Sequence, residues 1–272
     1  MFVQSPPSFA VWIVAIYCAI ARAPFVIDAH SDAFERARWT RPAWLNRLVA
    51  RQAVATIVTN EHWAGLVRSW GADAVSIAAI PTELLVGEPP PMKPGFNVTV
   101  VNSWSPDEPV GAVLSAAQSL PEVWFNVTGP RAEAKRLIGS TPPNVRFTGL
   151  LSQATYNGLL ASSDAVLCLT THDNTMQNGA CEALTLGTPV VTSDWPILRR
   201  YFEGAAVYVR NEPDGIVEGL RQLMADSGHF REESSRVRRR RAEEWHQTRR
   251  SLLEQITKRR VGPSVDQPRP AH

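Results

Sequence analysis

Short apolar runs alternate with longer amphipathic segments along most of this 272-residue chain, and this alternation constrains the fold more than any other feature. In the second half, runs that predict strands occupy residues 97–101, 123–127, 145–148, 165–169, 189–191 and 206–209. Segments that predict helices occupy residues 108–119, 131–138, 153–161, 177–186, 196–201 and 213–224. Alternating strands and helices are typical of a parallel sheet covered by helices on both faces. The sequence therefore predicts an α/β fold.

A proline-rich stretch at residues 87–95 divides this alternation into two parts. Four prolines in nine residues exclude a continuous helix or a central strand there. Before the stretch, strands are predicted at residues 2–4, 25–27, 55–59 and 74–80, with helical segments at 32–54 and 61–70. We predict one domain at residues 1–88 and a second at 96–257, which ends in a long charged helix at 230–256. Residues 258–272 are predicted to be a disordered tail.

The longest apolar run, at residues 9–21, is shorter than the ~20 residues that a bilayer-spanning helix needs. A signal peptide is the alternative, because Ala21-Arg22-Ala23 resembles a cleavage site, but no Lys or Arg precedes the run. We therefore predict a buried core helix. The predicted strands of this half make up only the second half of a doubly wound sheet, so we expect an upstream piece to precede Met1.

The positive charge of the chain is concentrated near its end. The net charge is +2, but residues 231–260 hold 11 Arg and Lys against 5 Asp and Glu, a balance of +6. Nucleic-acid binders usually spread their basic residues over a folded face, so this pattern argues against one. The cluster Arg236, Arg238, Arg239, Arg240 and Arg241 predicts either a solvated helix face or attraction to anionic lipid headgroups. The three cysteines show no metal-ligand spacing and indicate a reducing compartment.

A polar loop connects the apolar run at residues 164–169 to the helix predicted at 177–186. Such a loop at the carboxyl end of a strand is typical of phosphate binding in open α/β sheets. We expect the helix-start amides near Gln177, Asn178 and Gly179 to hold a diphosphate without a cation. Glu182, about one turn into the helix, is placed to accept hydrogen bonds from a ribose. Helix capping by an Asp, Asn or Thr within residues 173–179 is a compatible alternative.

Other predicted strands of the second domain also end in polar residues. Ser103, Thr128 and Gly129 follow two of these strands, and Arg131 comes two residues later. Strand ends along one edge of a sheet form a crevice that suits a nucleotide, whereas ordinary loop polarity is the alternative. In the first domain, His30 follows a predicted strand. It is either a residue of the acceptor side of the site or part of an ordinary polar loop.

Three motifs of the second half resemble the donor-binding domain of GT-B glycosyltransferases, in particular the retaining family 4 group. They are NVRFTG at residues 144–149, SDAVL at 163–167 and EALTLGTPVV at 182–191. The resemblance covers residues 97–209 well. It is looser over residues 2–83, where QSPP at 4–7, DAH at 28–30 and VTN at 58–60 carry it. It implies two Rossmann-type parallel-sheet domains in a GT-B-like fold, with the N-terminal acceptor domain incomplete.

The chain departs from the family pattern at two places. The family's Glu-x7-Glu motif has its second Glu at Glu182, but its first falls on Asn174, and Asp173 is a candidate substitute. The family also places an Arg and a Lys after the first strand of this domain, whereas residues 102–108 hold no cation. The implied catalytic residues are His30 and Asp173. The implied donor-binding residues are Ser103, Thr128, Gly129, Arg131, Asn174, Thr175, Gln177, Asn178, Gly179 and Glu182.

The resemblance implies an enzyme that moves a sugar from a nucleotide-sugar donor to a glycan or a lipid-linked acceptor, with retention of configuration. It implies no cofactor and no metal, because GT-B enzymes need no metal at the site. We expect no nucleic-acid partner and a cytoplasmic location with peripheral contact at the inner face of the cell membrane. Two alternatives are a non-catalytic nucleotide-sugar-binding remnant and a GT-B-type nucleotide-sugar epimerase, which would carry a denser set of charged residues.

Overall fold

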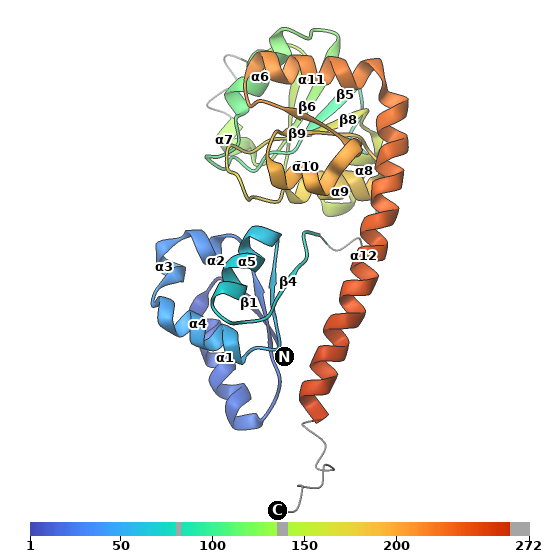
Figure 1. The fold of residues 1–272 in the computed structure, drawn as a ribbon. Helices are drawn as coiled ribbons and strands as arrows, with labels where there is room; N and C mark the ends of the chain where they lie inside the picture. The colour runs from blue at the N-terminus through green and yellow to red at the C-terminus, as the bar shows by residue number, and fades with distance from the viewer. Residues whose placement is uncertain (80–82, 135–140, 262–272) are drawn as a thin grey trace, which may run out of the picture. The chain divides into compact units, whose positions relative to one another are not determined.

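The computed structural model describes residues 1–79, 83–134 and 141–261, and the chain divides into two compact units (Figure 1). One unit comprises Met1–Ile80 together with Glu243–His272, and the other comprises Pro81–Ala242. Each unit is built on a parallel β-sheet with helices between its strands. The predicted fold class of two parallel-sheet α/β domains is therefore confirmed.

The first unit contains a four-stranded sheet in the order β1-β2-β3-β4, and all its strand pairs are parallel. Its strands are β1 (Phe2–Ser5), β2 (Val26–Ala29), β3 (Thr56–Val58) and β4 (Ala74–Ser76). Its helices are α1 (Ser8–Ala21), α2 (Asp32–Glu35), α3 (Ala37–Thr40), α4 (Ala43–Gln52) and α5 (Glu61–Ser69). Asn60 caps α5, because its side chain accepts a hydrogen bond from the Trp63 amide (3.1 Å).

Helix α1 differs from the predicted buried core helix. One face packs into the core of the unit through Val11, Ala15 and Cys18. The opposite face exposes five large apolar side chains, which are Phe9, Ile13, Ile16, Tyr17 and Ile20. The run is apolar all round, whereas a helix that covers one face of a sheet buries only one stripe. Among the described residues, no helix is long and apolar enough to span a membrane.

The second unit contains a six-stranded parallel sheet in the order β10-β9-β8-β5-β6-β7. Its strands are β5 (Phe96–Val100), β6 (Val123–Thr128), β7 (Val145–Gly149), β8 (Ala165–Cys168), β9 (Val190–Ser193) and β10 (Ala206–Val209). Its helices are α6 (Val110–Gln118), α7 (Arg131–Ala134), α8 (Gln153–Ser162), α9 (Asn178–Leu186), α10 (Pro196–Phe202) and α11 (Pro213–Ala225), with a 3-10 turn at Glu203–Ala205.

All six strands predicted for this unit are present within two residues of their predicted bounds. The helix predicted at 131–138 begins as α7, and its remaining positions lie outside the described residues. Buried Val98, Phe125 and Leu167 from three neighbouring strands form the centre of the core, with helices α6 and α11 packed against them. Asn144 fixes the turn between α6 and β6, because its Nδ2 lies 2.9 Å from each of three backbone oxygens, those of Ala117, Leu120 and Val123.

The strand order reverses beside β5. The chain runs from β5 to β6 and β7 on one side, and then returns to place β8 on the other side. The connections that leave the carboxyl ends of β5 and β8 therefore diverge and leave a crevice between them. This position fixes where the sheet is open to a ligand.

The last helix, α12 (Ser227–Val261), is longer than the helix predicted at 230–256 (Figure 1). The second domain was predicted to extend to residue 257, whereas the structure groups residues from Glu243 onward with the first unit. Leu252 and Ile256 pack against Val26 and Val54 there, and Arg259 Nη1 donates to the Ala53 oxygen (2.8 Å). The predicted tail at 258–272 begins with helical residues as far as 261, and residues 262–272 lie outside the described residues.

Candidate functional site

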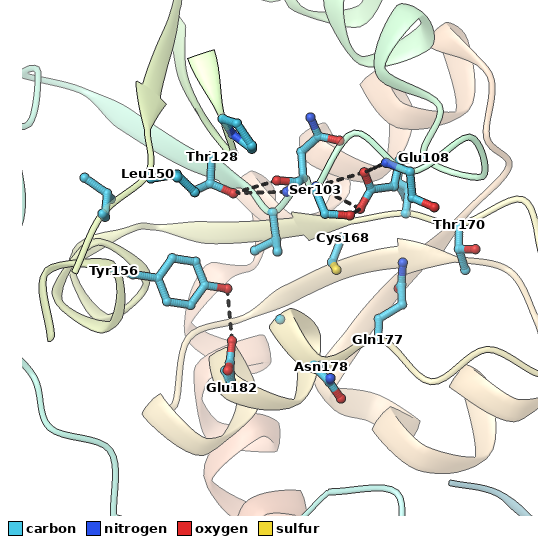
Figure 2. A pocket seen from close by; sticks show the side chains of 18 of the residues that line it. Ser103, Glu108, Thr128, Leu150, Tyr156, Cys168, Thr170, Gln177, Asn178 and Glu182 are labelled. Atoms are coloured by element: carbon cyan, nitrogen blue, oxygen red, sulfur yellow. Dashed lines mark hydrogen bonds between the residues drawn. The ribbon is translucent and has the colours of Figure 1, made fainter. Parts of the chain in front are cut away.

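A cavity of about 730 Å³ lies at the carboxyl ends of β5, β6 and β8 and at the start of α9 (Figure 2). Its walls include Val101 and Asn102 after β5, Thr128 at the end of β6, and Cys168 at the end of β8. This is the point at which the strand order reverses, where open α/β sheets bind their ligands. The structure therefore has a cavity at the place where the sequence predicts a crevice lined by polar strand ends.

The cavity brings together eight of the ten predicted donor-binding residues. These are Ser103, Thr128, Gly129, Thr175, Gln177, Asn178, Gly179 and Glu182. Arg131 and Asn174 lie outside the described lining, as does Asp173. Arg131 instead lies against the backbone of Gly149, so close that a Cβ added at Gly149 would be 3.1 Å from Arg131 Nε.

Neither of the two predicted catalytic residues is part of the described lining of the cavity. His30 belongs to the first unit, where it is exposed and its Nε2 lies 3.0 Å from Gln4 Nε2 and 3.7 Å from Asp28 Oδ2. Asp173 is exposed, and its Oδ1 accepts a hydrogen bond from the Asn174 amide (2.7 Å). Neither contact involves the cavity, so the catalytic roles of both residues stay predictions.

Glu182 is held by a residue that the sequence reasoning missed. The Tyr156 hydroxyl of α8 donates to Glu182 Oε2 (3.0 Å), and both side chains line the cavity (Figure 2). Burial raises the pKa of the Glu182 carboxyl, and the hydrogen bond from Tyr156 opposes that rise. Burial, followed by the charge of Glu182, also raises the pKa of Tyr156, which therefore remains a donor at neutral pH. Glu182 is a partly buried acceptor in a fixed orientation.

The loop between β5 and α6 folds around a carboxylate of its own. Glu108 accepts the Ser103 amide at Oε1 (3.0 Å) and Oε2 (2.9 Å), the Ser103 hydroxyl at Oε1 (2.9 Å) and the Ser105 amide at Oε2 (2.9 Å). Figure 2 shows Glu108 and Ser103 joined in this way at one side of the cavity. Trp104, between the two serines, has a φ of +65°, which turns the amides of its neighbours toward one point.

Asp107 ties the same loop to the end of β8. The Thr170 hydroxyl donates to Asp107 Oδ2 (2.6 Å), the Ser105 hydroxyl donates to Asp107 Oδ1, and the Thr171 amide donates to the Asp107 backbone oxygen (2.8 Å). Burial alone would raise the pKa of the Asp107 carboxyl, but the hydrogen bonds to its side chain, first those from Ser105 and Thr170, outweigh burial and the pKa is lowered. Asp107 is therefore charged at neutral pH and fixes one wall of the cavity.

The start of α9 approaches the end of β5 closely. A Cβ added at Gly179 would be 2.5 Å from Val101 Cγ1, so only glycine allows this contact. The N-cap residue is Gln177, whose side chain makes no capping hydrogen bond and accepts instead from the Thr192 hydroxyl (2.6 Å). The N-cap position is therefore held by a Gln and not by the Asp, Asn or Thr that the sequence predicted within residues 173–179. The first turn of α9, which lines the cavity, therefore receives no hydrogen bond from its own N-cap side chain.

The described lining of the cavity is acidic. Its charged side chains are Asp107, Glu108 and Glu182, and it contains no Arg, Lys or His. One neutral donor is available, because Asn102 is 5% exposed and its Nδ2 has no hydrogen-bond partner among the described residues. A buried donor without a partner is costly, so an acceptor on a ligand would stabilise it. Among the described residues, including this lining, no cluster of His, Cys, Asp and Glu has the geometry to hold a metal.

The basic cluster of α12 is largely engaged within the second unit. Arg236 pairs with Glu233, Arg238 donates to the Thr185 oxygen (3.0 Å), and both Arg240 and Arg241 pair with Glu203. Arg241 also donates to the backbone oxygens of Arg200 and Tyr201 (2.7 Å each). Most of these cations therefore have protein partners, and contact with anionic lipid stays a prediction.

Comparison with solved structures defines the fold class of the protein. Three solved structures share the fold at low identity. Sucrose-phosphate synthase from Thermosynechococcus elongatus is 16% identical, with a TM-score of 0.66 over 93% of this chain and 73% of that chain. HepE from Anabaena, in complex with UDP-glucose, is 16% identical, with a TM-score of 0.71 over 94% of this chain and 78% of that chain. The pneumococcal O-GlcNAc transferase GtfA, in complex with UDP and GlcNAc, is 13% identical, with a TM-score of 0.63 over 90% of this chain and 60% of that chain. The two parallel-sheet units thus have the GT-B glycosyltransferase fold.

The family follows from the sequence match. Residues 111–257 match the family described as glycosyl transferase-like, and residues 1–83 match a glycosyl transferase 4-like domain. The first match covers more than half of the chain, so the protein belongs to the glycosyl transferase-like family. The predicted class, a GT-B glycosyltransferase, is confirmed. No curated protein sequence matches the chain.

Proposed function

We propose that this glycosyltransferase moves a sugar from a nucleotide-sugar donor to a glycan or lipid-linked acceptor, with retention of configuration. The observation that carries the proposal is the cavity at the strand-order reversal, in which Glu182 is a partly buried acceptor oriented by Tyr156. A nucleotide ribose presents two hydroxyl donors, and a fixed carboxylate is the side chain that accepts both. HepE, solved with UDP-glucose, supports a uridine nucleotide as the first donor to test.

In the proposed complex the ribose binds Glu182 and the diphosphate lies toward the first turn of α9. Asn178 and Gly179 line the cavity there, and the N-cap residue Gln177 makes no capping hydrogen bond to that turn. Helix-start amides and the positive end of the helix dipole stabilise anions. Stabilisation of the charge that develops on the departing diphosphate is a common source of rate enhancement. The proposal assigns that role to the α9 amides and to no metal or cofactor.

The acidic lining favours a second candidate, a nucleotide-sugar-binding protein without transfer activity. Asp107, Glu108 and Glu182 are the charged side chains of the described lining, and no Arg or Lys stands among them. A departing diphosphate carries negative charge, so these carboxylates oppose its formation more than they oppose binding of the sugar or the nucleoside. Binding without turnover would distinguish this candidate from the enzyme.

Calorimetric titration with a panel of nucleotide sugars tests the donor site directly. We expect at least one donor to bind the wild type, and E182A to weaken that binding at least about 10-fold, because each hydrogen bond to a charged acceptor is worth about 1.5–3 kcal/mol. The matched control is Glu218→Ala, which removes an exposed carboxylate of α11. Release of nucleoside diphosphate in the presence of glycan or lipid-linked acceptors separates the enzyme from the binding protein. If no donor binds, the proposal fails.

The proposal also places the protein at the cytoplasmic face of a membrane, with peripheral contact. Arg239 is exposed in the middle of the basic cluster, so it is the cation best placed to meet a lipid surface. Pelleting with vesicles of anionic and of neutral lipid measures this contact. We expect binding to the anionic vesicles that weakens in R239A, and no pelleting with either vesicle would remove the membrane contact.

A further inference from the structure

The carboxylate of Glu108 occupies a cradle of hydrogen-bond donors at the edge of the cavity. Two backbone amides and one hydroxyl of Ser103 and Ser105 converge on it within 3.0 Å. Trp104 adopts a left-handed backbone conformation between them, at a φ of +65°. Successive amides on either side of a left-handed residue form a concave anion-binding site. The loop is therefore built for an anion, and the anion it holds is part of the chain.

The cradle faces the same cavity in which the donor is proposed to bind. Ser103, Ser105 and Glu108 all line that cavity, as does Cys168 at the end of β8. Burial, followed by the charge of Glu108, raises the pKa of the Cys168 thiol, so the negative charge of Glu108 reaches the end of this strand. An approaching phosphate would meet that charge with no cation in the described lining to offset it.

We infer that Glu108 is a specificity-determining residue, which fills the anion cradle of the β5–α6 loop and so disfavours ligands that bring a phosphate to that loop. The inference rests on the proposed function and specifies which part of the donor the site selects against. The diphosphate of a bound donor is then confined to the α9 side of the cavity. The nucleoside and the sugar, which are neutral, are bound without this penalty.

The test compares two variants with the wild type. Glu108→Gln removes the charge and keeps the shape of the side chain, and Glu108→Ala empties the cradle. Glu122→Gln is the control, because Glu122 is an exposed carboxylate between α6 and β6 and does not line the cavity. Each protein is titrated calorimetrically with uridine, with UDP and with inorganic pyrophosphate. Circular dichroism of each variant verifies that the fold is retained.

In E108Q and E108A we expect the affinity for UDP to rise on the order of tenfold, because a like charge a few ångströms away is removed. The affinity for uridine should not change, and the gain for UDP should shrink at high ionic strength. An unchanged or weaker UDP affinity in both variants, or the same gain in E122Q, would overturn the inference.

Pyrophosphate separates this inference from the proposed function. If no protein binds uridine or UDP, the proposed uridine-nucleotide site fails, and pyrophosphate alone decides the role of Glu108. Binding of pyrophosphate to E108A that is at least about tenfold tighter than to the wild type supports an anion cradle filled by Glu108. Equal or undetectable binding to both proteins overturns it.

Discussion

Replacing Glu182 by Gln should change stability and ligand binding in opposite directions. Glu182 is partly buried, and burial raises the pKa of its carboxyl above the ordinary value of 4.5. Compared with the unfolded chain, the folded protein therefore holds the Glu182 proton more tightly, and it loses stability as the pH rises through the raised pKa. Gln keeps an oxygen that accepts the Tyr156 hydroxyl but carries no charge. At pH 7 we expect E182Q to be more stable than the wild type.

The size of this effect follows from the geometry. Each unit of pKa shift corresponds to about 1.4 kcal/mol, and the remaining solvent contact of Glu182 reduces the cost of its charge. We expect a gain on the order of 1 kcal/mol in the free energy of unfolding at pH 7. Below about pH 4.5 the carboxyl is protonated in both the folded and the unfolded chain, so the gap should close there. Uridine binding should weaken about 10- to 100-fold, because the charged acceptor is lost.

Urea unfolding followed by tryptophan fluorescence at several pH values between 4 and 8 measures the stability gap, and calorimetry measures uridine binding. Glu218→Gln serves as the control, because Glu218 is exposed and lies outside the described cavity lining. The reasoning is refuted if E182Q is less stable than the wild type at pH 7, or if the gap widens on acidification.

Two substitutions and one labelling experiment probe the second unit further. Asn144→Asp would place a carboxylate against three backbone oxygens and should lower the free energy of unfolding by about 3 kcal/mol, measured with urea. Gly179→Ala would bring a Cβ to 2.5 Å from Val101 Cγ1. The overpacking should cost about 1–3 kcal/mol of folding stability, more than the ~1 kcal/mol that alanine gains in helix propensity. We therefore expect a less stable protein that binds nucleoside more weakly. Burial raises the pKa of the Cys181 thiol to about 12 and also raises that of Cys168, so neither thiol should react with a disulfide reagent at pH 8 until urea unfolds the chain.

Each of these expectations has a contrary result. An N144D variant with an unchanged urea midpoint would show that the three carbonyl contacts contribute little. A stabilised G179A variant would show that α9 moves away from β5 without cost. Thiol reaction at the same rate in native and unfolded protein would show that the ends of β8 and α9 open readily.

The strands of the second unit were predictable because their signal is local. β-branched runs such as Val98–Val100 and Val190–Val191 are short and buried on both faces, and polar residues follow within two positions. The eight predicted residues that line the cavity were found by the same rule, since parallel strands bring their carboxyl ends to one edge. Local pattern and sheet geometry are enough for that part of the site.

The missed residues depend on contacts that no local pattern encodes. Tyr156 reaches Glu182 from 26 residues earlier in the chain, on a helix whose own sequence resembles any surface helix. Glu108 binds the loop only because Trp104 adopts a left-handed conformation, which a bulky side chain rarely does. The exposed face of α1 was missed because a fully apolar run does not reveal which of its sides packs.

The partners of Arg241 give the basic segment a structural role. This side chain donates to the backbone oxygens at the end of α10, where helical carbonyls lack partners of their own, and it also pairs with Glu203. A cation that looks like surface charge in the sequence is thus a tether between two helices of the second unit. Proteolytic removal of the segment from residue 241 onward should consequently leave α10 frayed, and faster amide exchange in its last turn would report this.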